Sequence, residues 1–320
     1  MQAVRAHEGD VLRFETIPDP EPSAGEVVVE LRVAGLNRRD LFVRSGVFPF
    51  PLPLVPGSDG AGVRRDTGEE VVVFPGLGWG EREDAPAPGF GILGGPRDGT
   101  YAELIALPEE NLYPKPPGFS WEEAAVFPLA AVTVYRALFS RGRLEAGETL
   151  LVLGAGSGVS TFAVQLGVQT GARVVVTSSS DEKIERAKEL GADAGVNYAT
   201  TEDWPAAVSE LGSVDVVLDS VGSTWQQSLD CVRPGGRVVV LGGTGGTEVT
   251  LGVRPFYFKQ QSLYGTQLGS PRDFEGLLRM LEDATWRPVL DSVRPLSEAE
   301  AALERMSAGE HFGKLALAIG

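Results

Sequence analysis

The feature that most constrains the fold is a glycine-rich turn set between a short apolar run and an amphipathic helix pattern. The run is Thr149–Leu153, and residues 154–160 then read Gly-Ala-Gly-Ser-Gly-Val-Ser. A strand, a tight turn and a helix start present free N–H groups and a positive helix end to a phosphate. Glycine suits this turn because a Cβ would clash with a pyrophosphate lying against the backbone. The segment therefore predicts a dinucleotide site in mid-chain.

The second half of the chain alternates apolar strands with helical patterns. We expect strands at 150–153, 173–177, 214–218 and 237–241, and helices at 121–141 and 181–190. This alternation is typical of an α/β fold with a doubly wound parallel sheet. The alternative to a dinucleotide site is a Rossmann-like domain that binds another nucleotide or S-adenosylmethionine.

The first half, up to about residue 118, is β-rich and divided by Gly and Pro. Strand-like runs occur at 27–33, 60–63, 70–74 and 101–107. Residues 76–99 are polar and rich in Gly and Pro, which indicates a surface lobe. The final apolar run, 313–319, has no evident place in the parallel sheet, so we expect it to rejoin the first domain.

Charge and residue inventory exclude several functions. A net charge of −16 argues against nucleic acid or an anionic membrane as partner. One cysteine and two histidines are too few to assemble a usual zinc site, so we expect no metal. The N-terminal residues show no apolar signal region, and no segment reaches transmembrane length, which favours a cytoplasmic protein.

The residues after the second strand of the parallel sheet bear on the choice of nucleotide. NAD-selective sites place Asp or Glu at the end of that strand to accept from the ribose hydroxyls. This chain has Ser178, Ser179 and Ser180 there, followed by Lys183. Hydroxyls and a cation suit a 2′-phosphate, which a carboxylate would repel. We therefore predict NADPH as cofactor, with Ser180 also capping the next helix.

Taken together, the motifs resemble the medium-chain dehydrogenase/reductase superfamily, in particular its zinc-independent quinone oxidoreductase-like branch. The segments that carry the resemblance are 34–46, 56–62, 99–103, 130–138, 189–198, 219–222 and 312–314, besides the glycine turn. The resemblance implies a GroES-like β-rich catalytic domain, residues 1–120 and 263–320, with a Rossmann domain inserted at residues 121–262.

The resemblance also locates the missing metal. Zinc-dependent members have ligands where this chain has Asn37, Ser58 and Leu129, and clustered cysteines where it has the 76–99 lobe. Other departures are Ser157 and Ser160 in place of glycine in the turn, and Phe48 where many reductases have tyrosine. Serine is small enough for the turn to keep its packing, whereas the missing tyrosine leaves the substrate class open.

Site residues follow from the resemblance position by position. Asn37, Asp40 and Thr133 are expected to line the nicotinamide end of the cleft, although Asp40 is equally well explained as a structural partner of nearby arginines. The expected cofactor-binding residues are Gly154, Ala155, Gly156, Ser157, Gly158, Val159, Ser160, Ser178, Ser179, Lys183, Tyr198, Val221, Gly222, Gly242, Gly243, Phe312 and Lys314.

The function implied is hydride transfer from NADPH to a quinone or an α,β-unsaturated carbonyl, because such substrates accept hydride without a Lewis acid. One alternative is a reductase for a specific enone or enoyl thioester, for which Arg38, Arg39 and Arg44 are the basic candidates. Another, of a different class, is an idle NADPH-binding sensor or scaffold. The family implies a homodimer, and 247–254 is a plausible edge strand for it.

Overall fold

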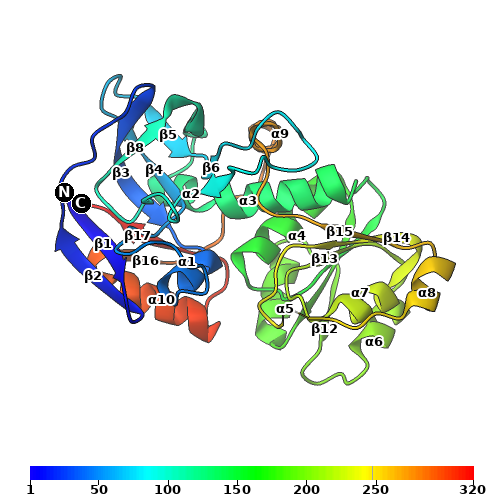
Figure 1. The fold of residues 1–320 in the computed structure, drawn as a ribbon. Helices are drawn as coiled ribbons and strands as arrows, with labels where there is room; N and C mark the ends of the chain where they lie inside the picture. Colours follow the sequence, from blue (N-terminus) through cyan, green and yellow to red (C-terminus); the bar gives the residue numbers. More distant parts are fainter. Residues whose placement is uncertain (247) are drawn as a thin grey trace. The chain divides into compact units, whose positions relative to one another are not determined.

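The computed structural model describes residues 1–246 and 248–320, which form two compact units (Figure 1). Unit 1 comprises Met1–Val132 and Ser270–Gly320, and unit 2 comprises Thr133–Gly269. Both divisions lie further along the chain than residues 120 and 263, where the sequence placed them. Residues 121–132 join unit 1 because their first helix packs against its sheet, and residues 263–265 add a strand to the sheet of unit 2.

Unit 1 is built on a seven-stranded sheet with the order β16-β17-β3-β4-β5-β9, in which β8 also pairs with β3. The strands of unit 1 are β1 (Gln2–His7), β2 (Val11–Thr16), β3 (Glu26–Gly35), β4 (Asp59–Arg64), β5 (Glu70–Val73), β6 (Gly76–Leu77), β7 (Gly91–Ile92), β8 (Leu104–Pro108), β9 (Leu112–Pro114), β16 (Leu290–Pro295) and β17 (Lys314–Ala318). The C-terminal strand β17 pairs antiparallel with β3, so the last segment does rejoin the first domain.

The helices of unit 1 correct one prediction. They are α1 (Arg38–Arg44), α2 (Trp121–Val126), α3 (Pro128–Tyr135, which runs into unit 2), α9 (Pro271–Glu282), α10 (Ala299–Ala308) and the 3₁₀ turns η1 (Glu109–Asn111) and η3 (Leu296–Glu298). The single helix expected at 121–141 is wrong. It is broken at Pro128, which has no N–H to continue α2, and residues 136–141 form a π-helical stretch, η2 (Arg136–Arg141).

Residues 76–99 are more buried than the surface lobe that the sequence predicts. Trp79 and Leu93 are buried, and Leu93 belongs to the hydrophobic core of unit 1. Strands β6 and β7 pair within the lobe, and Trp79 packs edge-to-face on Phe90. Only its middle, around 81–85, is exposed throughout. Apolar side chains thus fasten this polar-looking segment to the domain.

Unit 2 is a doubly wound sheet of parallel strands in the order β12-β11-β10-β13-β14-β15 (Figure 1). The strands are β10 (Thr149–Val152), β11 (Arg173–Ser178), β12 (Ala194–Asn197), β13 (Val214–Asp219), β14 (Val232–Val240) and β15 (Ser262–Gly265). Its helices are α4 (Gly158–Thr170), α5 (Asp181–Glu189), α6 (Trp204–Glu210), α7 (Trp225–Cys231) and α8 (Val253–Phe258). This strand order is that of a Rossmann fold, in which ligands bind at the carboxyl ends of the strands beside the reversal of strand order.

The edge strand expected at 247–254 is wrong for the residues that the structure describes; Thr247 lies outside them. Residues 248–252 are irregular and residues from Val253 begin helix α8. Pro255 favours this outcome, since it is tolerated in the first turn of a helix but removes a donor from a strand. The strand at this end of the sheet is β15, which pairs with β14.

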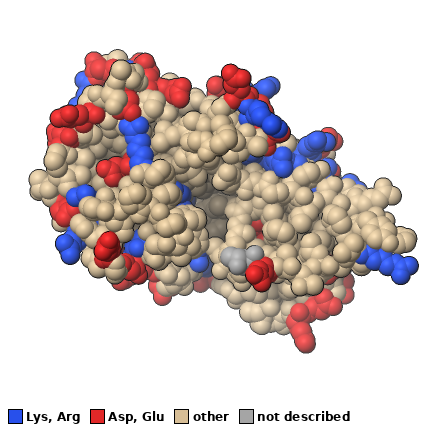
Figure 2. Space-filling view, viewed as in Figure 1, with Lys and Arg blue, Asp and Glu red and all other residues tan. Residues whose placement is uncertain are grey.

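On the face shown in Figure 2, acidic side chains are scattered over the surface with basic ones among them. Within the described residues, no helix is both long and apolar enough to cross a bilayer. The charged side chains visible on this face are solvated.

Candidate functional site

The glycine turn lies at the carboxyl end of β10 and begins helix α4. Gly154 and Gly156 have φ angles of +75° and +110°, which disfavour any side chain. Ser157 caps the helix by accepting from the N–H of Ser160, at 3.1 Å. The Ser160 hydroxyl accepts from the N–H of Gly156, at 3.0 Å. Both serines that replace family glycines therefore stabilise the turn.

The same turn retains the features that a pyrophosphate needs. A Cβ built on Gly154 would meet no atom within 4 Å, so the space beside it is open. The first N–H groups of a helix have no partner in the helix itself, and Gly158 and Val159 are the first two residues of α4. Ala155 is fixed by donating its N–H to Thr177 O, at 2.7 Å. The residues present fit a dinucleotide here.

Ser178 and Lys183 lie beside this turn. Ser178 ends β11 and is buried, Ser179 is exposed, and Ser180 caps α5 by accepting from the N–H of Lys183. The aliphatic part of Lys183 lies over Gly156: a Cβ on that glycine would be 2.7 Å from Lys183 Cδ. Tyr198 follows the neighbouring strand, donates its N–H to Ser178 O at 2.9 Å, and is exposed. These predicted residues are therefore brought together.

Two further glycine loops meet at the ends of β13 and β14. A Cβ on Gly222, whose φ is +95°, would lie 2.6 Å from Gly243 Cα and 2.8 Å from Gly242 O. Asp219 shapes this corner, and sequence reasoning gave it no role. Its carboxylate is fully buried and accepts from the N–H groups of Val221 and Gly222 and from the hydroxyls of Thr224 and Ser228. The feature of the sequence that could have identified Asp219 is its place at the end of an apolar strand, just before a Val-Gly turn.

Unit 1 holds a separate buried polar cluster at the start of helix α1. Asn37 precedes the helix and donates its backbone N–H to Asp40 Oδ2, at 2.8 Å. Tyr101 donates its hydroxyl proton to the same oxygen, also at 2.8 Å. Burial raises the pKa of the Asp40 carboxyl, and burial beside that carboxyl raises the pKa of the Tyr101 hydroxyl. Asp40 is completely buried, and the bond from the Asn37 N–H gives it a structural role in capping α1; the two hydrogen bonds to its Oδ2 come from Asn37 and Tyr101, not from the arginines that the sequence suggested.

The side chain of Asn37 lies between opposite charges. Its Nδ2 donates to Asp59 Oδ2 at 2.8 Å, and its Oδ1 accepts from Lys314 Nζ at 2.7 Å. Lys314 and Asp59 are 4% and 0% exposed. Burial raises the pKa of the Asp59 carboxyl and lowers that of the Lys314 ammonium, while the opposite charge of each partner counteracts these shifts. Sequence reasoning did not single out Asp59, although it lies inside a recognised motif.

The three positions at which zinc members have ligands do not fit a metal in this chain. Asn37 is bonded to an ammonium group, which would repel a cation. Ser58 accepts from Arg39 Nη1 and donates to Leu93 O, each at 2.7 Å. The third position, Leu129, has an apolar side chain, and its backbone N–H donates to Asp59 Oδ1 at 2.7 Å. Among the described residues, no three His, Cys, Asp or Glu side chains are grouped to hold a metal ion.

The remaining predicted residues are placed as follows. Thr133 lies on α3 and is buried. Phe312 is buried in unit 1, where its N–H donates to Asp291 Oδ1 at 3.0 Å. Phe48 is exposed and packs edge-to-face on Phe42. The ammonium group of Lys314 donates to Asn37, Asp59 and the Leu36 carbonyl. Its cofactor contact stays a prediction.

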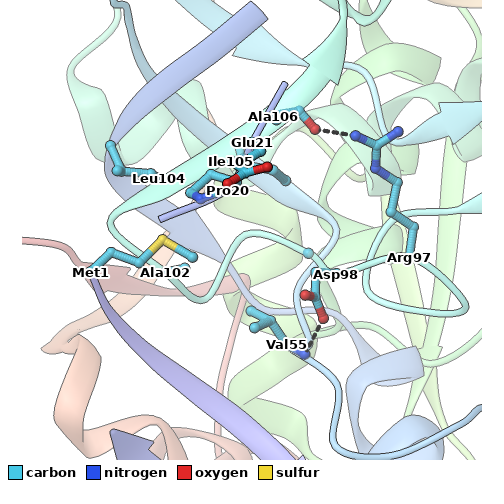
Figure 3. Close-up of a pocket in the computed structure, with 11 residues that line it drawn as sticks. Met1, Pro20, Glu21, Val55, Arg97, Asp98, Ala102, Leu104, Ile105 and Ala106 are labelled. Carbon is cyan, nitrogen blue, oxygen red and sulfur yellow. Dashed lines mark hydrogen bonds between the residues drawn. The ribbon is translucent and has the colours of Figure 1, made fainter. Parts of the chain in front are cut away.

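A cavity of about 200 Å³ in unit 1 lies elsewhere, near the N-terminus (Figure 3). Two of its charged side chains are engaged by the protein: Arg97 pairs with Glu26 at 2.7 Å, and Asp98 accepts from the N–H of Val55 at 2.8 Å. None of the predicted site residues lines it. We therefore do not assign the active site to this cavity.

Comparisons with known proteins agree with both folds. Residues 23–117 match the family described as alcohol dehydrogenase GroES-like domain, and residues 158–283 match that described as zinc-binding dehydrogenase. A zinc-type alcohol dehydrogenase-like protein from Schizosaccharomyces pombe is 35% identical, with 97% of this chain and 96% of that protein covered. A quinone oxidoreductase from Pseudomonas aeruginosa is 37% identical, covering 86% of this chain and 82% of the relative. The crystal structure of an NAD-dependent alcohol dehydrogenase is 37% identical, with complete coverage of both chains and a TM-score of 0.93.

The fold and these relatives thus identify an oxidoreductase with a GroES-like domain and a Rossmann domain. The chain belongs to the medium-chain dehydrogenase/reductase superfamily.

Proposed function

We propose that this protein is a zinc-independent, NADPH-dependent oxidoreductase that transfers hydride to a quinone or an α,β-unsaturated carbonyl. The observation that carries the proposal is the cluster of Asn37, Asp59 and Lys314, which puts an amide between an ammonium and a carboxylate where zinc members bind metal. NADPH supplies the hydride when bound. The chain supplies hydrogen-bond donors for the oxygen that becomes negative, and quinones and enones need little more.

The preference for NADPH is supported by Ser178 and Lys183. The end of β11 carries a serine instead of a carboxylate, and the lysine of the next helix lies beside the glycine turn. A 2′-phosphate would gain a charge-assisted hydrogen bond from this lysine. Because one structural relative is named as NAD-dependent, the preference for NADPH rests on these residues and not on the fold.

The enoyl thioester alternative has less support. Of its three candidate arginines, Arg39 is directed inward, bonding Ser58 and the Leu93 carbonyl. Arg44 is paired with Asp10 and Glu300, both at 2.7 Å. Only Arg38 is exposed. A single arginine is a weak binding site for the phosphates of coenzyme A or an acyl carrier.

The direct test is NADPH consumption by purified, chelator-treated protein. We expect turnover of a small quinone and an enone, none of a saturated aldehyde, and no change on adding zinc. A CoA thioester turned over much faster than the matched simple enone would establish the thioester alternative. Tight NADPH binding without turnover would favour the sensor or scaffold, and aldehyde reduction restored by metal would contradict the proposal.

We further propose a homodimer formed through the β15 end of the unit 2 sheet. Helix α8 exposes Val253, Tyr257 and Phe258, with 72%, 58% and 65% of each residue accessible. Apolar side chains gathered in this way are typical of an interface. Light scattering should give twice the 33.9 kDa chain mass. Replacing Tyr257 and Phe258 with aspartate should give monomers, and a wild-type monomer at micromolar concentration would contradict the proposal.

A further inference from the structure

We propose that Lys314 and Asp59 are positioning residues that fix the Asn37 amide, so that its one unshared N–H proton is kept for the substrate oxygen. The inference rests on the proposed hydride transfer and identifies how the chain assists it. Neither Lys314 nor Asp59 touches the substrate in this scheme. Both act through Asn37, which lies 277 positions from the lysine in the chain.

Charge determines the orientation of the amide. As placed, Asn37 Oδ1 faces the Lys314 ammonium at 2.7 Å and Nδ2 faces the Asp59 carboxylate at 2.8 Å. Rotating the amide by 180° would put its NH₂ group against the ammonium and its oxygen against the carboxylate. An ammonium has no acceptor and a carboxylate has no donor, so both hydrogen bonds would be lost. Only one orientation is therefore stable.

When the donors and acceptors of the cluster are matched, one N–H of Asn37 has no acceptor among the described residues. The Lys314 ammonium has three protons, and its three acceptors are Leu36 O, Asn37 Oδ1 and Asp59 Oδ2, at 2.6, 2.7 and 3.4 Å. The Asn37 NH₂ group has two protons, of which Asp59 takes one. Within residues 1–246 and 248–320 the second proton has no acceptor, and Asn37 keeps 6% exposure. This N–H group is therefore available to donate to a substrate oxygen.

The ammonium group also changes the strength of this donor. A cation that is hydrogen-bonded to the carbonyl oxygen of an amide draws electron density from the amide nitrogen, so the N–H bond becomes more polar. The best ligand for such a donor is an oxygen that becomes negative during the reaction, as in an enolate or a hydroquinone anion. A purely structural cluster would merely tie β17 to β4 and to the start of α1 and would not depend on the Asn37 amide.

A double-mutant cycle separates these readings. The variants are Asn37→Ala, the neutralised pair Lys314→Met with Asp59→Asn, and all three changes together. Removing one oxyanion donor typically lowers kcat by about 100-fold or more, and we expect a loss of at least about 10-fold from each variant. The combined variant should be no slower than Asn37→Ala alone. Multiplied losses would mean independent roles and would overturn the inference.

Conservative and control variants guard against a folding effect. The variant with Lys314→Gln and Asp59→Asn keeps a hydrogen-bond donor beside Asn37 Oδ1. It should recover part of the kcat that the methionine variant loses, whichever of these two variants is the more stable. Lys115→Met with Glu70→Gln removes another lysine–carboxylate pair of the same unit, at 3.1 Å, in which Glu70 is exposed and neither residue belongs to the site. That control should keep wild-type kcat. The kcat of every variant is measured at saturating NADPH, so that any contribution of Lys314 to cofactor binding does not enter the comparison.

The proposed function and this inference fail in different ways. If the wild type reduces no quinone or enone, the proposed function fails and the inference falls with it. If the wild type is active and Asn37→Ala keeps kcat within twofold, hydride transfer stands and the positioning of Asn37 is overturned. A loss in the glutamine variant equal to that in the methionine variant also counts against it, because orientation would then not be the cause.

Discussion

Replacing Lys183 with glutamate is expected to raise the Kd for NADPH by about 100-fold and that for NADH by less than about fivefold. The wild-type lysine lies next to the glycine turn and one helix turn beyond the serines that end β11. A glutamate at this position would replace an attraction to the 2′-phosphate with a repulsion. A 100-fold change corresponds to about 2.7 kcal/mol of binding free energy. Fluorescence titration with both nucleotides measures it.

The matched control is Lys188→Glu, since that residue is on the same helix, exposed and paired only with Glu185 among the described residues. It should change neither Kd by more than about twofold. Equal losses of NADPH and NADH in the Lys183 variant would contradict 2′-phosphate recognition. They would instead place the lysine at the pyrophosphate, to which its position over Gly156 also gives access.

Local patterns in the sequence were enough to predict the Rossmann unit. The glycine turn, the β-branched strands and the serine cap on α5 each depend on neighbours within a few residues, and all three are present in the structure. Strands β12 and β15 were not predicted. Each is four residues long, and Gly195 and Gly265 weaken their β pattern. Their pairing comes from the sheet rather than from intrinsic preference.

The polar cluster of unit 1 could be predicted only in part. Asn37 and Asp40 were named, because they share one motif at the start of α1. Tyr101 and Asp59 were not named, although both lie in recognised segments. Tyr101 meets Asp40 across 61 positions and Asp59 meets Asn37 across 22, so no local periodicity reports the contact. Their partners became visible only when the β strands had been paired.

A long-range contact that stabilises the C-terminal segment was likewise not predicted from the sequence. Helix α9 carries Phe274, which is fully buried and packs on Phe74 and Tyr113 with ring centroids 5.2 and 4.9 Å apart. Its ring is also parallel to that of Phe127, at 5.9 Å. One aromatic side chain thus joins the end of β5, strand β9 and the α2–α3 junction to a helix that follows 137 residues of unit 2. The sequence alone gave this phenylalanine no prominence.

Replacing Phe274 with alanine should therefore lower the free energy of unfolding by about 3–5 kcal/mol, because it removes three ring contacts and leaves a cavity. Arg279→Ala, on the exposed side of the same helix, should change it by less than about 0.5 kcal/mol. Urea denaturation followed by circular dichroism gives both values, and the Kd for NADPH reports whether unit 2 is intact. A loss below about 1 kcal/mol in the Phe274 variant would show that these aromatic rings do not hold the C-terminal segment to unit 1.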